Sequence, residues 1–186
     1  MAKPIIIAVV GLIGSGKTEA TRSFVEHGFF RVGYNDRIYE EVERRGLQRI
    51  EKDERMVRED MRHKEGMGVM AQRSVPFIEE ALRAGKNIVI ESLYSWSEYR
   101  LTKEKFGDQF RVLAIFAPPD IRYARLAKRE VRPHINDEAR SRDYAEIENI
   151  EKAGPIAMAD WTIQNTGTKE EFTASVDALI NAIFKN

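Results

Sequence analysis

The sequence predicts an α/β fold built on a parallel sheet with helices on both faces. Two observations predict it: short aliphatic and aromatic runs recur five times along the chain, and stretches with helical spacing lie between them. This alternation is typical of βαβ units, whose crossover helices cover both faces of a sheet. With 186 residues, 42% of them apolar, the chain has the length of one domain with its own core. We therefore expect residues 1–186 to form a single domain.

Strands are expected at five segments. The first, residues 5–10, reads IIIAVV, a continuous aliphatic run that is typical of a strand buried on both faces of a parallel sheet. The other four runs occupy residues 29–33, 87–90, 110–116 and 160–164. Their spacing leaves room for a crossover helix after each of the first four strands.

Helical spacing marks eight segments. They occupy residues 17–27, 36–45, about 51–64, 67–84, 95–106, 121–130, 137–152 and 168–184. Two of them open on the spacing of a capping box, which pairs Ser95 with Glu98 and Thr168 with Glu171. Glycine readily adopts the left-handed conformation that ends a helix, and glycines stand at three expected helix ends: Gly28, Gly85 and Gly107.

Two parts of the domain are expected to contact substrates. The charged segment between the second and third strands, residues 47–70, lies where an acceptor-binding insertion is expected. Residues 129–142 are expected to form a small lid. Its least regular part, residues 131–137, contains a proline among charged residues, a composition typical of a mobile flap.

Composition excludes several classes of partner and chemistry. Lysine plus arginine and aspartate plus glutamate both number 30, so the overall charge favours neither nucleic acid nor an anionic membrane. The chain has no cysteine, which excludes disulfides and thiolate nucleophiles and fits a reducing compartment. The apolar run at residues 4–13 is too short to span a bilayer. We expect a soluble, cytoplasmic protein without nucleic-acid or membrane partners.

The stretch GLIGSGKT, residues 11–18, follows the first expected strand and opens the first expected helix. It matches G-x-x-x-x-G-K-[ST] in full, in the context that this P-loop pattern requires. We expect backbone N–H groups from Gly11, Gly14, Ser15 and Gly16 and the positive end of the helix to surround phosphate oxygens. The side chain of Lys17 would reach the β and γ phosphates, and the hydroxyl of Thr18 would bind Mg²⁺. The alternative is a glycine-rich turn with an incidental lysine.

A P-loop predicts nucleotide binding, and the rest of the sequence has to indicate the reaction. GTPases carry an N-K-x-D segment that reads the base, and QNTGTKEE at residues 164–171 does not match it. Motor and transporter ATPases have an apolar strand that ends in adjacent acids, whereas NIVIESL offers only Glu91. A small-molecule kinase needs Mg²⁺, an acid near the acceptor and arginines around the transferred phosphate. The sequence supplies all of these.

Two acids follow expected strands at the sheet edge where ligands of α/β folds bind. Asp36, after the second strand, is predicted to orient an acceptor hydroxyl or take its proton; alternatively it is a favourable charge at a helix N-terminus. Glu91, at the end of the third strand, is predicted to hold Mg²⁺ through water or to contact the acceptor. Its alternative is an ordinary glutamate at a strand end.

Arginines recur around the expected lid. Arg122, Arg125, Arg129 and Arg132 would share one face of a helix that points into the flap. There they would neutralise charge on the transferred phosphoryl group as the lid closes. The alternative is a solvated helix face whose arginines pair with nearby acids.

Further candidates lie on the acceptor side. Arg62 in the 47–70 segment is predicted to bind the acceptor, with Arg132 from the lid; Arg62 would otherwise belong to an exposed charged helix. Tyr94 and Trp96 follow Glu91, and they would either stack on an acceptor ring or pack in the core.

The chain resembles the nucleoside monophosphate kinase-like branch of P-loop proteins, especially the small dephospho-CoA-kinase-like and adenylate-kinase-like enzymes. The resemblance rests on GLIGSGKTEA, NDRIYEEVERRG, MAQRSVPFIEEAL, FGDQFRVLAIFAPPDIRYARLAKRE and MADWTIQNTGTKEEF, which together span nearly the whole chain. It implies a five-stranded parallel sheet, a requirement for ATP and Mg²⁺, and phosphoryl transfer to a small acceptor.

The resemblance also implies roles for single residues. Asp36 falls where dephospho-CoA kinases have the base for the acceptor hydroxyl, and Arg129 falls at the lid arginine that contacts ATP. Asn165, Thr166 and Gly167 look like the loop that lies along the adenine. The chain departs from the family at Glu91, followed by Ser92 and Leu93, where the family more often has aspartate followed shortly by glycine or proline.

These observations lead to one main hypothesis and two alternatives. The main one is an ATP-dependent kinase that acts on a nucleotide or nucleoside-like acceptor, of the nucleoside monophosphate or dephospho-CoA type. The first alternative is a P-loop module that binds ATP and switches a partner without transferring phosphate. The second is an ATPase that acts on a macromolecule, which the neutral charge and the lack of an adjacent acid pair disfavour.

Overall fold

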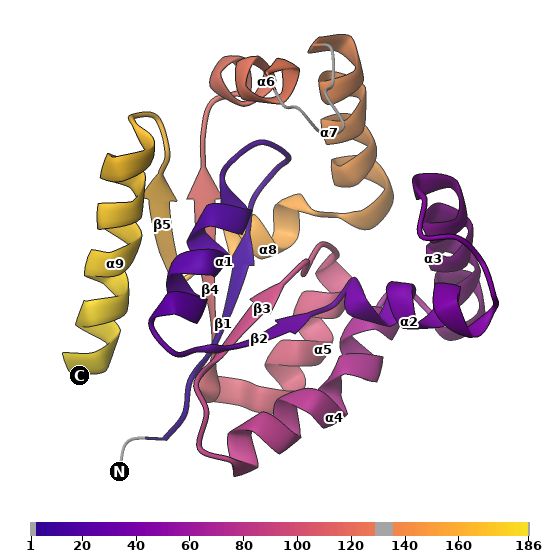
Figure 1. The fold of residues 1–186 in the computed structure, drawn as a ribbon, viewed down its shortest axis with the longest axis horizontal. Coiled ribbons are helices and arrows are strands. Elements are labelled where there is room, and N and C mark those ends of the chain that lie inside the picture. The colour runs from indigo at the N-terminus through magenta and orange to yellow at the C-terminus, as the bar shows by residue number, and fades with distance from the viewer. Residues whose placement is uncertain (1–2, 129–135, 186) are drawn as a thin grey trace.

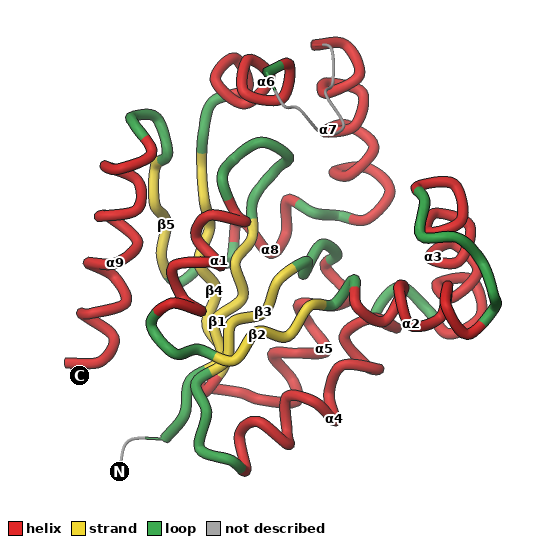
Figure 2. Tube along the Cα trace, viewed as in Figure 1, coloured by secondary structure: helices red, strands yellow, loops and turns green. Residues whose placement is uncertain are grey.

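The computed structural model describes residues 3–128 and 136–185. Its centre is a parallel sheet of five strands in the order β2-β3-β1-β4-β5 (Figures 1 and 2). The strands are β1 (Ile6–Val10), β2 (Phe30–Gly33), β3 (Ile88–Glu91), β4 (Phe110–Phe116) and β5 (Trp161–Gln164). The predicted fold class and all five predicted strands are therefore confirmed, with ends that differ by at most one residue.

The third strand shifts by one residue from its predicted position. Asn87 lies just before the strand, where its side chain and its carbonyl both accept hydrogen bonds from the backbone of neighbouring segments. Its side-chain Oδ1 accepts a hydrogen bond from the N–H of Ile5 at 3.0 Å, and its carbonyl accepts one from the N–H of Phe30 at 2.8 Å. Glu91 instead belongs to β3, where it pairs with Gly33 of β2.

Helices cover both faces of the sheet (Figure 1). On one face α1 (Lys17–Glu26) and α9 (Lys169–Lys185) pack over a core that includes Phe24 and Val176. On the other face lie α4 (Val69–Arg83), α5 (Trp96–Phe106) and α8 (Ala153–Ala157), over a larger core that includes Ile78. The fully buried side chains of β1 supply both cores alternately, as expected for a central parallel strand.

Four further helices stand at or beyond the carboxyl ends of the strands, where Figure 1 shows them above and beside the sheet. They are α2 (Asp36–Arg44), α3 (Glu51–Glu65), α6 (Pro119–Ala127) and α7 (Asn136–Ile150). A short 3₁₀ turn, η1 (Gly107–Gln109), precedes β4. The predicted insertion at residues 47–70 consists of α3 with the connection into α4.

Both predicted capping boxes are present. The hydroxyl of Ser95 accepts a hydrogen bond from the N–H of Glu98 at 3.1 Å, and the Glu98 carboxylate accepts one from the N–H of Ser95 at 2.9 Å. Thr168 and Glu171 make the equivalent pair of bonds, at 3.2 and 2.9 Å. The predicted helix ends at Gly28, Gly85 and Gly107 are also confirmed, since all three adopt positive φ just after a helix.

The segment around the predicted lid differs most from the prediction. Helix α6 was expected at residues 121–130 but begins at Pro119 and ends at Ala127. It begins two residues early because the fixed φ of proline suits the first turn of a helix. Helix α7 was expected at residues 137–152 but ends at Ile150, where Glu151 turns to φ +54°. Helix α8 was not predicted. Residues 136–142 of the expected lid form the first turns of α7, and its other residues lie outside the described part of the chain.

Among residues 3–128 and 136–185, no helix combines the length and the apolar character needed to cross a bilayer.

Candidate active site

The P-loop joins the carboxyl end of β1 to the first turn of α1. Gly11, Gly14 and Gly16 all have positive φ, at 146°, 80° and 108°, so the loop adopts a conformation that favours glycine at each position. The hydroxyl of Ser15 is buried and has no hydrogen-bond partner among the described residues. A turn of this kind, followed at once by a helix N-terminus, presents backbone donors to an anion. The loop therefore fits a phosphate chain.

Contacts within the protein also require all three of these glycines, since a Cβ at Gly11 would lie 2.5 Å from the backbone oxygen of Ile115. A Cβ at Gly14 would lie 2.9 Å from the backbone oxygen of Arg122, and a Cβ at Gly16 would lie 2.3 Å from the side-chain nitrogen of Asn165. Small residues are favoured here because a Cβ would stand between the backbone amides and a bound phosphate. The structure adds a second reason, which is that α6 and the loop after β5 pack directly on the P-loop.

Lys17 and Thr18 open α1. The ammonium of Lys17 donates a hydrogen bond to the carbonyl of Leu12 at 2.9 Å, so it lies across the loop to which it belongs. A bound phosphate chain would compete with that carbonyl for the ammonium group. The side chain of Thr18 is exposed, which leaves its hydroxyl accessible to a metal ion.

Asn165 joins three parts of the nucleotide side of the site. Its side-chain N–H donates to the carbonyl of Ser15 in the P-loop at 2.8 Å. Arg125 of α6 donates to the backbone and side-chain oxygens of Asn165 at 3.0 and 3.1 Å, and to the carbonyl of Gly167 at 3.4 Å. Asn165 is buried, whereas Thr166 and Gly167 are exposed beside it. The segment predicted to lie along the adenine is thus fixed to the P-loop by one side chain.

On the side predicted to bind the acceptor, Arg31 holds Asp36 and Glu91 together. Its Nε donates to Glu91 at 2.6 Å, and its two terminal nitrogens donate to the two carboxylate oxygens of Asp36 at 2.9 and 3.2 Å. Glu91 ends β3, which is the neighbour of β1 in the sheet. The two acids that the sequence singled out therefore share one cation at the carboxyl edge, next to the strand that leads into the P-loop.

Arg31 was not among the residues predicted for the site. Partial burial opposes its charge, but hydrogen bonds and charge attraction from Asp36 and Glu91 outweigh this effect and raise the pKa of its guanidinium group. Gly33 is necessary for the arrangement, because a Cβ there would lie 2.6 Å from both Arg31 and Asp36. The sequence feature that could have identified Arg31 is its position within the short second strand, two residues before a glycine.

The arginines of α6 do not form the single face that we expected. Arg122 is buried and donates to the carbonyls of Ile13 and Ala117 at 2.9 and 3.0 Å, while Arg125 binds the loop after β5. Helical spacing predicted one shared face, but each guanidinium group reaches a different neighbouring segment. Arg129 and Arg132 lie outside the described residues.

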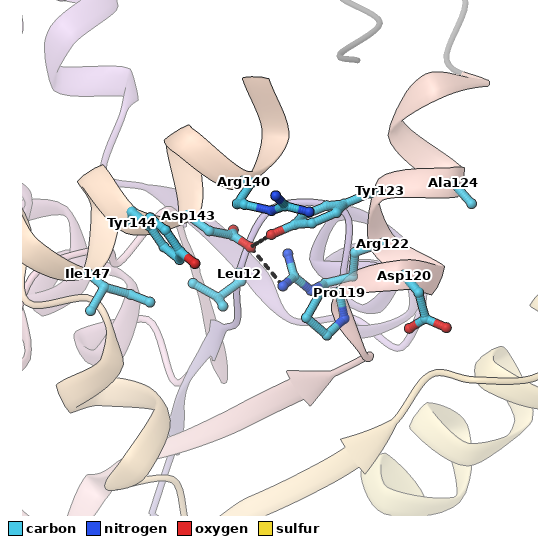
Figure 3. A pocket seen from close by; sticks show the side chains of 10 residues that line it. All are labelled: Leu12, Pro119, Asp120, Arg122, Tyr123, Ala124, Arg140, Asp143, Tyr144 and Ile147. Carbon is cyan, nitrogen blue, oxygen red and sulfur yellow. Dashed lines mark hydrogen bonds and ion pairs between the residues drawn. The ribbon is translucent and has the colours of Figure 1, made fainter. Parts of the chain in front are cut away.

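Arg122 also joins α6 to α7. It forms an ion pair with Asp143 at 2.7 Å, and the hydroxyl of Tyr123 donates to the same carboxylate oxygen at 2.8 Å. Figure 3 shows these three side chains between α6 and α7, at a cavity of about 600 Å³ that also reaches Leu12 of the P-loop. Since Arg122 binds the P-loop carbonyl of Ile13 as well, α7 is connected to the P-loop through one buried guanidinium group.

Arg62, Tyr94 and Trp96 have different surroundings. The side chain of Arg62 is largely buried, 4.0 Å from Glu98, and lines a cavity between α3 and α7. Tyr94 lines the same cavity, and its hydroxyl donates to Ser92 at 3.1 Å. Trp96 stacks on Tyr99 with ring centroids 4.9 Å apart, so its indole packs against the protein's own core.

A magnesium site with few protein ligands fits these residues. The described part of the chain has no cluster of three or more histidine or acidic side chains that would form a metal cage. Mg²⁺ at phosphate-transfer sites is held mainly by substrate phosphates and water, with one or two protein oxygens. Thr18 offers an exposed hydroxyl at the P-loop, and Glu91 a carboxylate at the end of the adjacent strand.

Sequence comparisons agree with this reading of the fold. A model of the AAA domain family matches residues 7–149. A UPF0200/UPF0201 protein of Archaeoglobus fulgidus is 32% identical over 97% of this chain, and the alignment spans 56% of that relative's length. A UPF0200 protein of Thermococcus onnurineus is 31% identical, with 96% of this chain and 97% of the relative aligned.

Solved structures share the architecture. The protein TT1252 of Thermus thermophilus has a TM-score of 0.66 and 22% identity, with 97% of this chain and 98% of that chain covered. A shikimate kinase of Bacteroides thetaiotaomicron has a TM-score of 0.60 and 14% identity, over 96% and 98% of the chains. A dephospho-CoA kinase of Campylobacter jejuni has a TM-score of 0.58 and 15% identity, over 98% of both chains. The chain therefore has the fold of P-loop kinases.

Proposed function

The chain belongs to the AAA domain family and to the UPF0200 proteins, and from this premise and the site geometry we propose that it is an ATP-dependent kinase. It transfers the γ-phosphoryl group to a nucleotide or nucleoside-like acceptor, of the nucleoside monophosphate or dephospho-CoA type. The observation that carries the proposal is the acid pair Asp36 and Glu91, held by Arg31 beside the strand that leads into the P-loop.

The nucleotide half of the site follows from the P-loop and the segments packed on it. Backbone N–H groups of residues 11–16 and the ammonium of Lys17 bind the phosphates, and Asn165, Thr166 and Gly167 lie along the adenine. Thr18 and Glu91 hold Mg²⁺, which screens the charge of the phosphates when it is bound. Arg129, outside the described residues, contacts ATP from the lid in this proposal.

The acceptor half explains why two acids lie at the carboxyl edge of the sheet, beside the strand that leads into the P-loop. For an acceptor that reacts through a hydroxyl, as in the dephospho-CoA type, Asp36 orients this hydroxyl and takes its proton while its oxygen forms a bond to the γ phosphorus; the bond from this phosphorus to the bridging oxygen breaks, and ADP leaves. Arg31 keeps the Asp36 carboxylate in one orientation, because it binds both carboxylate oxygens. Arg62 and Arg132 bind the anionic part of the acceptor.

The similar structures support a small-molecule acceptor. Two of them are named as a shikimate kinase and a dephospho-CoA kinase. At 14 and 15% identity, the likeness concerns the fold, and the acceptors in those names belong to those proteins. The present acceptor has to be identified by experiment.

A coupled assay of ADP release tests the proposal. The protein is incubated with ATP and Mg²⁺ and a panel of nucleoside monophosphates, deoxynucleotides, nucleosides and dephospho-CoA, beside a control without acceptor. We expect release to rise sharply with one acceptor class. Lys17→Ala should abolish this release, and Asp36→Asn should abolish it while ATP binding by calorimetry stays intact. Asp108→Asn, an exposed aspartate in η1 before β4, serves as the matched control.

A second function, a P-loop switch that binds ATP without transferring phosphate, is favoured by one observation. Arg31 occupies both oxygens of Asp36, so the carboxylate has fewer sites left for an acceptor. The same assay separates the two. Slow ADP release that no acceptor stimulates, with ATP binding unaffected by Asp36→Asn, would contradict the kinase proposal and support the switch.

A further inference from the structure

Two carbonyl groups of the P-loop are held by side chains from outside the loop. The carbonyl of Ile13 accepts a hydrogen bond from Arg122 of α6 at 2.9 Å. The carbonyl of Ser15 accepts one from the side chain of Asn165, which follows β5, at 2.8 Å. Each of these carbonyls belongs to the residue before a glycine of the loop. The two donors come from different elements, so the loop is held from two directions.

A held carbonyl also fixes the direction of the next N–H group. A peptide bond is planar, and in the trans form its C=O and N–H point in opposite directions; the described residues contain no cis peptide bond. The N–H of Gly14 therefore points away from Arg122. By the same geometry, the N–H of Gly16 points away from Asn165.

Helix α6 closes the other side of Gly14. A Cβ at this glycine would lie 2.9 Å from the backbone oxygen of Arg122 and 3.1 Å from the side chain of Leu126. The side chain of the preceding Ile13 packs in a small core with Leu126 and with Ala139 of α7. An anion can therefore approach Gly14 only from the side that faces away from α6, which is the direction of its N–H.

Arg122 has one partner for each of its three nitrogen atoms. Besides the bond from Nη1 to Ile13, Nε donates to the carbonyl of Ala117 at 3.0 Å, and Nη2 pairs with Asp143 of α7 at 2.7 Å (Figure 3). The side chains of Arg122 and Asp143 are 3% and 5% exposed, so little water competes for these bonds. A planar guanidinium group with three fixed partners has one orientation.

Asn165 is oriented by a second arginine of the same helix. Arg125 donates to the backbone oxygen of Asn165 at 3.0 Å and to its side-chain oxygen at 3.1 Å. The side-chain nitrogen of the buried Asn165 is thereby directed at the carbonyl of Ser15. Helix α6 thus acts on the loop directly through Arg122 and indirectly through Arg125.

We infer that Arg122 and Asn165 are positioning residues, which turn the N–H groups of Gly14 and Gly16 toward the phosphate chain of the bound nucleotide. The inference rests on the proposed function, because it assigns these two donors to the phosphates of ATP. Neither positioning side chain touches the phosphates. Since Asp143 holds the guanidinium group of Arg122, the position of α7 also acts on the Gly14 N–H.

NMR with ADP and Mg²⁺ tests the two N–H groups separately. An amide proton that donates to an anion shifts downfield, so assigned ¹⁵N–¹H spectra at saturating ADP report each glycine by itself. In the wild type, the signals of Gly14 and Gly16 should both move downfield. Arg122→Met should remove most of the Gly14 shift and keep the Gly16 shift. Asn165→Asp, which keeps the oxygen for Arg125 but loses the donor, should do the reverse.

Calorimetry measures what the Gly14 donor contributes to affinity. Loss of one hydrogen bond to a charged group should weaken ADP binding about tenfold in Arg122→Met. Removal of Arg122 alone leaves Asp143 buried without its cation, which is strongly destabilising. If that variant does not fold, the double variant Arg122→Met with Asp143→Asn removes both charges. Its net charge equals that of the wild type, so a tenfold loss there is not a general loss of attraction for the nucleotide.

Arg37→Met is the matched control for loss of a buried arginine. The side chain of Arg37 is 8% exposed and pairs with Glu40 on α2 at 2.7 Å. This variant should be less stable than the wild type, but both glycine shifts and the affinity for ADP should stay unchanged.

Three results would overturn the inference. The first is a wild type in which the Gly14 signal does not move downfield with ADP and Mg²⁺. The second is a Gly14 shift of wild-type size in folded Arg122→Met or in the double variant. The third is an equal loss of the Gly14 and Gly16 shifts in these variants, because the whole loop and not one peptide would then have changed.

The kinase proposal fails separately from this inference. It fails if no acceptor stimulates ADP release, even when the Gly14 shift depends on Arg122 and the Gly16 shift depends on Asn165.

Discussion

At the scale of single residues, several glycines are needed because other side chains occupy the space of a Cβ. A Cβ at Gly16 would meet Asn165, and a Cβ at Gly33 would meet Arg31 and Asp36. The absence of a Cβ at Gly16 lets Asn165 reach the carbonyl of Ser15. The absence of a Cβ at Gly33 lets Arg31 reach the carboxylate of Asp36. The two halves of the site therefore depend on residues that contribute no side chain.

Gly16→Ala is expected to impair nucleotide binding. The added methyl group would lie 2.3 Å from the Asn165 side-chain nitrogen, at a φ of +108°. Either the loop or Asn165 has to move, and loss of one charge-assisted contact to phosphate, about 1.5 kcal/mol, would weaken ATP binding about tenfold. Calorimetry with ATP and Mg²⁺ measures this.

Gly28→Ala provides the control. Gly28 has a similar φ of +86°, but nothing lies within 4 Å of its added Cβ. It should therefore cost only the strain of the left-handed backbone, about 1–2 kcal/mol of unfolding free energy, and leave ATP affinity unchanged. Equal ATP affinity in the two variants would contradict the role assigned to the contact between Gly16 and Asn165.

Gly33→Ala should disturb the acceptor side and spare the nucleotide side. Its Cβ would lie 2.6 Å from both Arg31 and Asp36, so the bridge between Asp36 and Glu91 has to open. We expect a lower kcat/KM for the acceptor with an unchanged Kd for ATP. Gly68→Ala, whose nearest neighbour would be a leucine methyl at 3.4 Å, should change neither quantity; a loss of ATP affinity in Gly33→Ala would contradict the prediction.

At the scale of elements, a buried acid binds α2 to its neighbours. Glu41 of α2 accepts hydrogen bonds from Arg44 and Arg45 on its own helix, at distances of 2.6 to 2.8 Å. Arg73 of α4 lies 3.7 Å from the same carboxylate, and Arg45 also donates to Asp60 of α3 at 2.7 Å. The three helices α2, α3 and α4, on the proposed acceptor side, are thus connected through one network of charges.

This network predicts a dependence of stability on pH. The two hydrogen bonds from Arg44 lower the pKa of Glu41, burial opposes them, and the hydrogen bond from Arg45 lowers it further, so that the pKa falls from 4.5 to about 2. Because the pKa is lower in the folded state, the stabilisation is complete above pH 4.5 and is lost as the pH falls toward 2. Urea unfolding at pH 6 and pH 3 should show a wild-type advantage over Glu41→Gln that shrinks at the lower pH.

Glu43→Gln is the control for this experiment. Glu43 lies on the same helix, and its side chain is exposed. An exposed carboxylate of this kind contributes little to stability, so the difference from wild type should stay small at both pH values. A Glu41→Gln difference that is equally large at pH 6 and pH 3 would contradict the role of the ionised carboxylate.

At the scale of the whole molecule, the nucleotide site is assembled from distant parts of the chain. The hydrogen bond from Asn165 to Ser15 joins residues 150 positions apart, and Arg122 joins the P-loop to α7. A ligand seated in the P-loop is therefore in contact with segments that hold the first and last thirds of the chain together. Its binding should stabilise the entire domain.

Nucleotide should accordingly raise the melting temperature. At a ligand concentration of one hundred times Kd, the stabilisation is about 2.7 kcal/mol, which corresponds to roughly 5–10 °C for a domain of this size. Differential scanning calorimetry with ATP and Mg²⁺ should show the shift in wild type and in Lys86→Ala, a variant of an exposed lysine just before β3. The shift should be nearly absent in Lys17→Ala, and an undiminished shift there would contradict the P-loop assignment.

The sequence alone determined the features whose physical cause lies within a few residues. The aliphatic run of β1, the P-loop with its glycines, both capping boxes and the helix ends at Gly28, Gly85 and Gly107 depend on local backbone conformation, periodicity and side chains three or four positions apart. These local features, arranged in alternation, were sufficient to predict a parallel sheet with helices on both faces. They also placed Asp36 and Glu91 at the same edge of that sheet.

Only the tertiary structure decided which side chains meet across the site. Arg31 between Asp36 and Glu91, Asn165 on the P-loop, and Arg122 between the P-loop and Asp143 all depend on how separate elements pack. Helical spacing put Arg122 and Arg125 on one predicted face, yet buried polar groups take whichever partner the fold brings within hydrogen-bond distance. Such partners lie up to 150 positions away along the chain, where local patterns carry no information about contact.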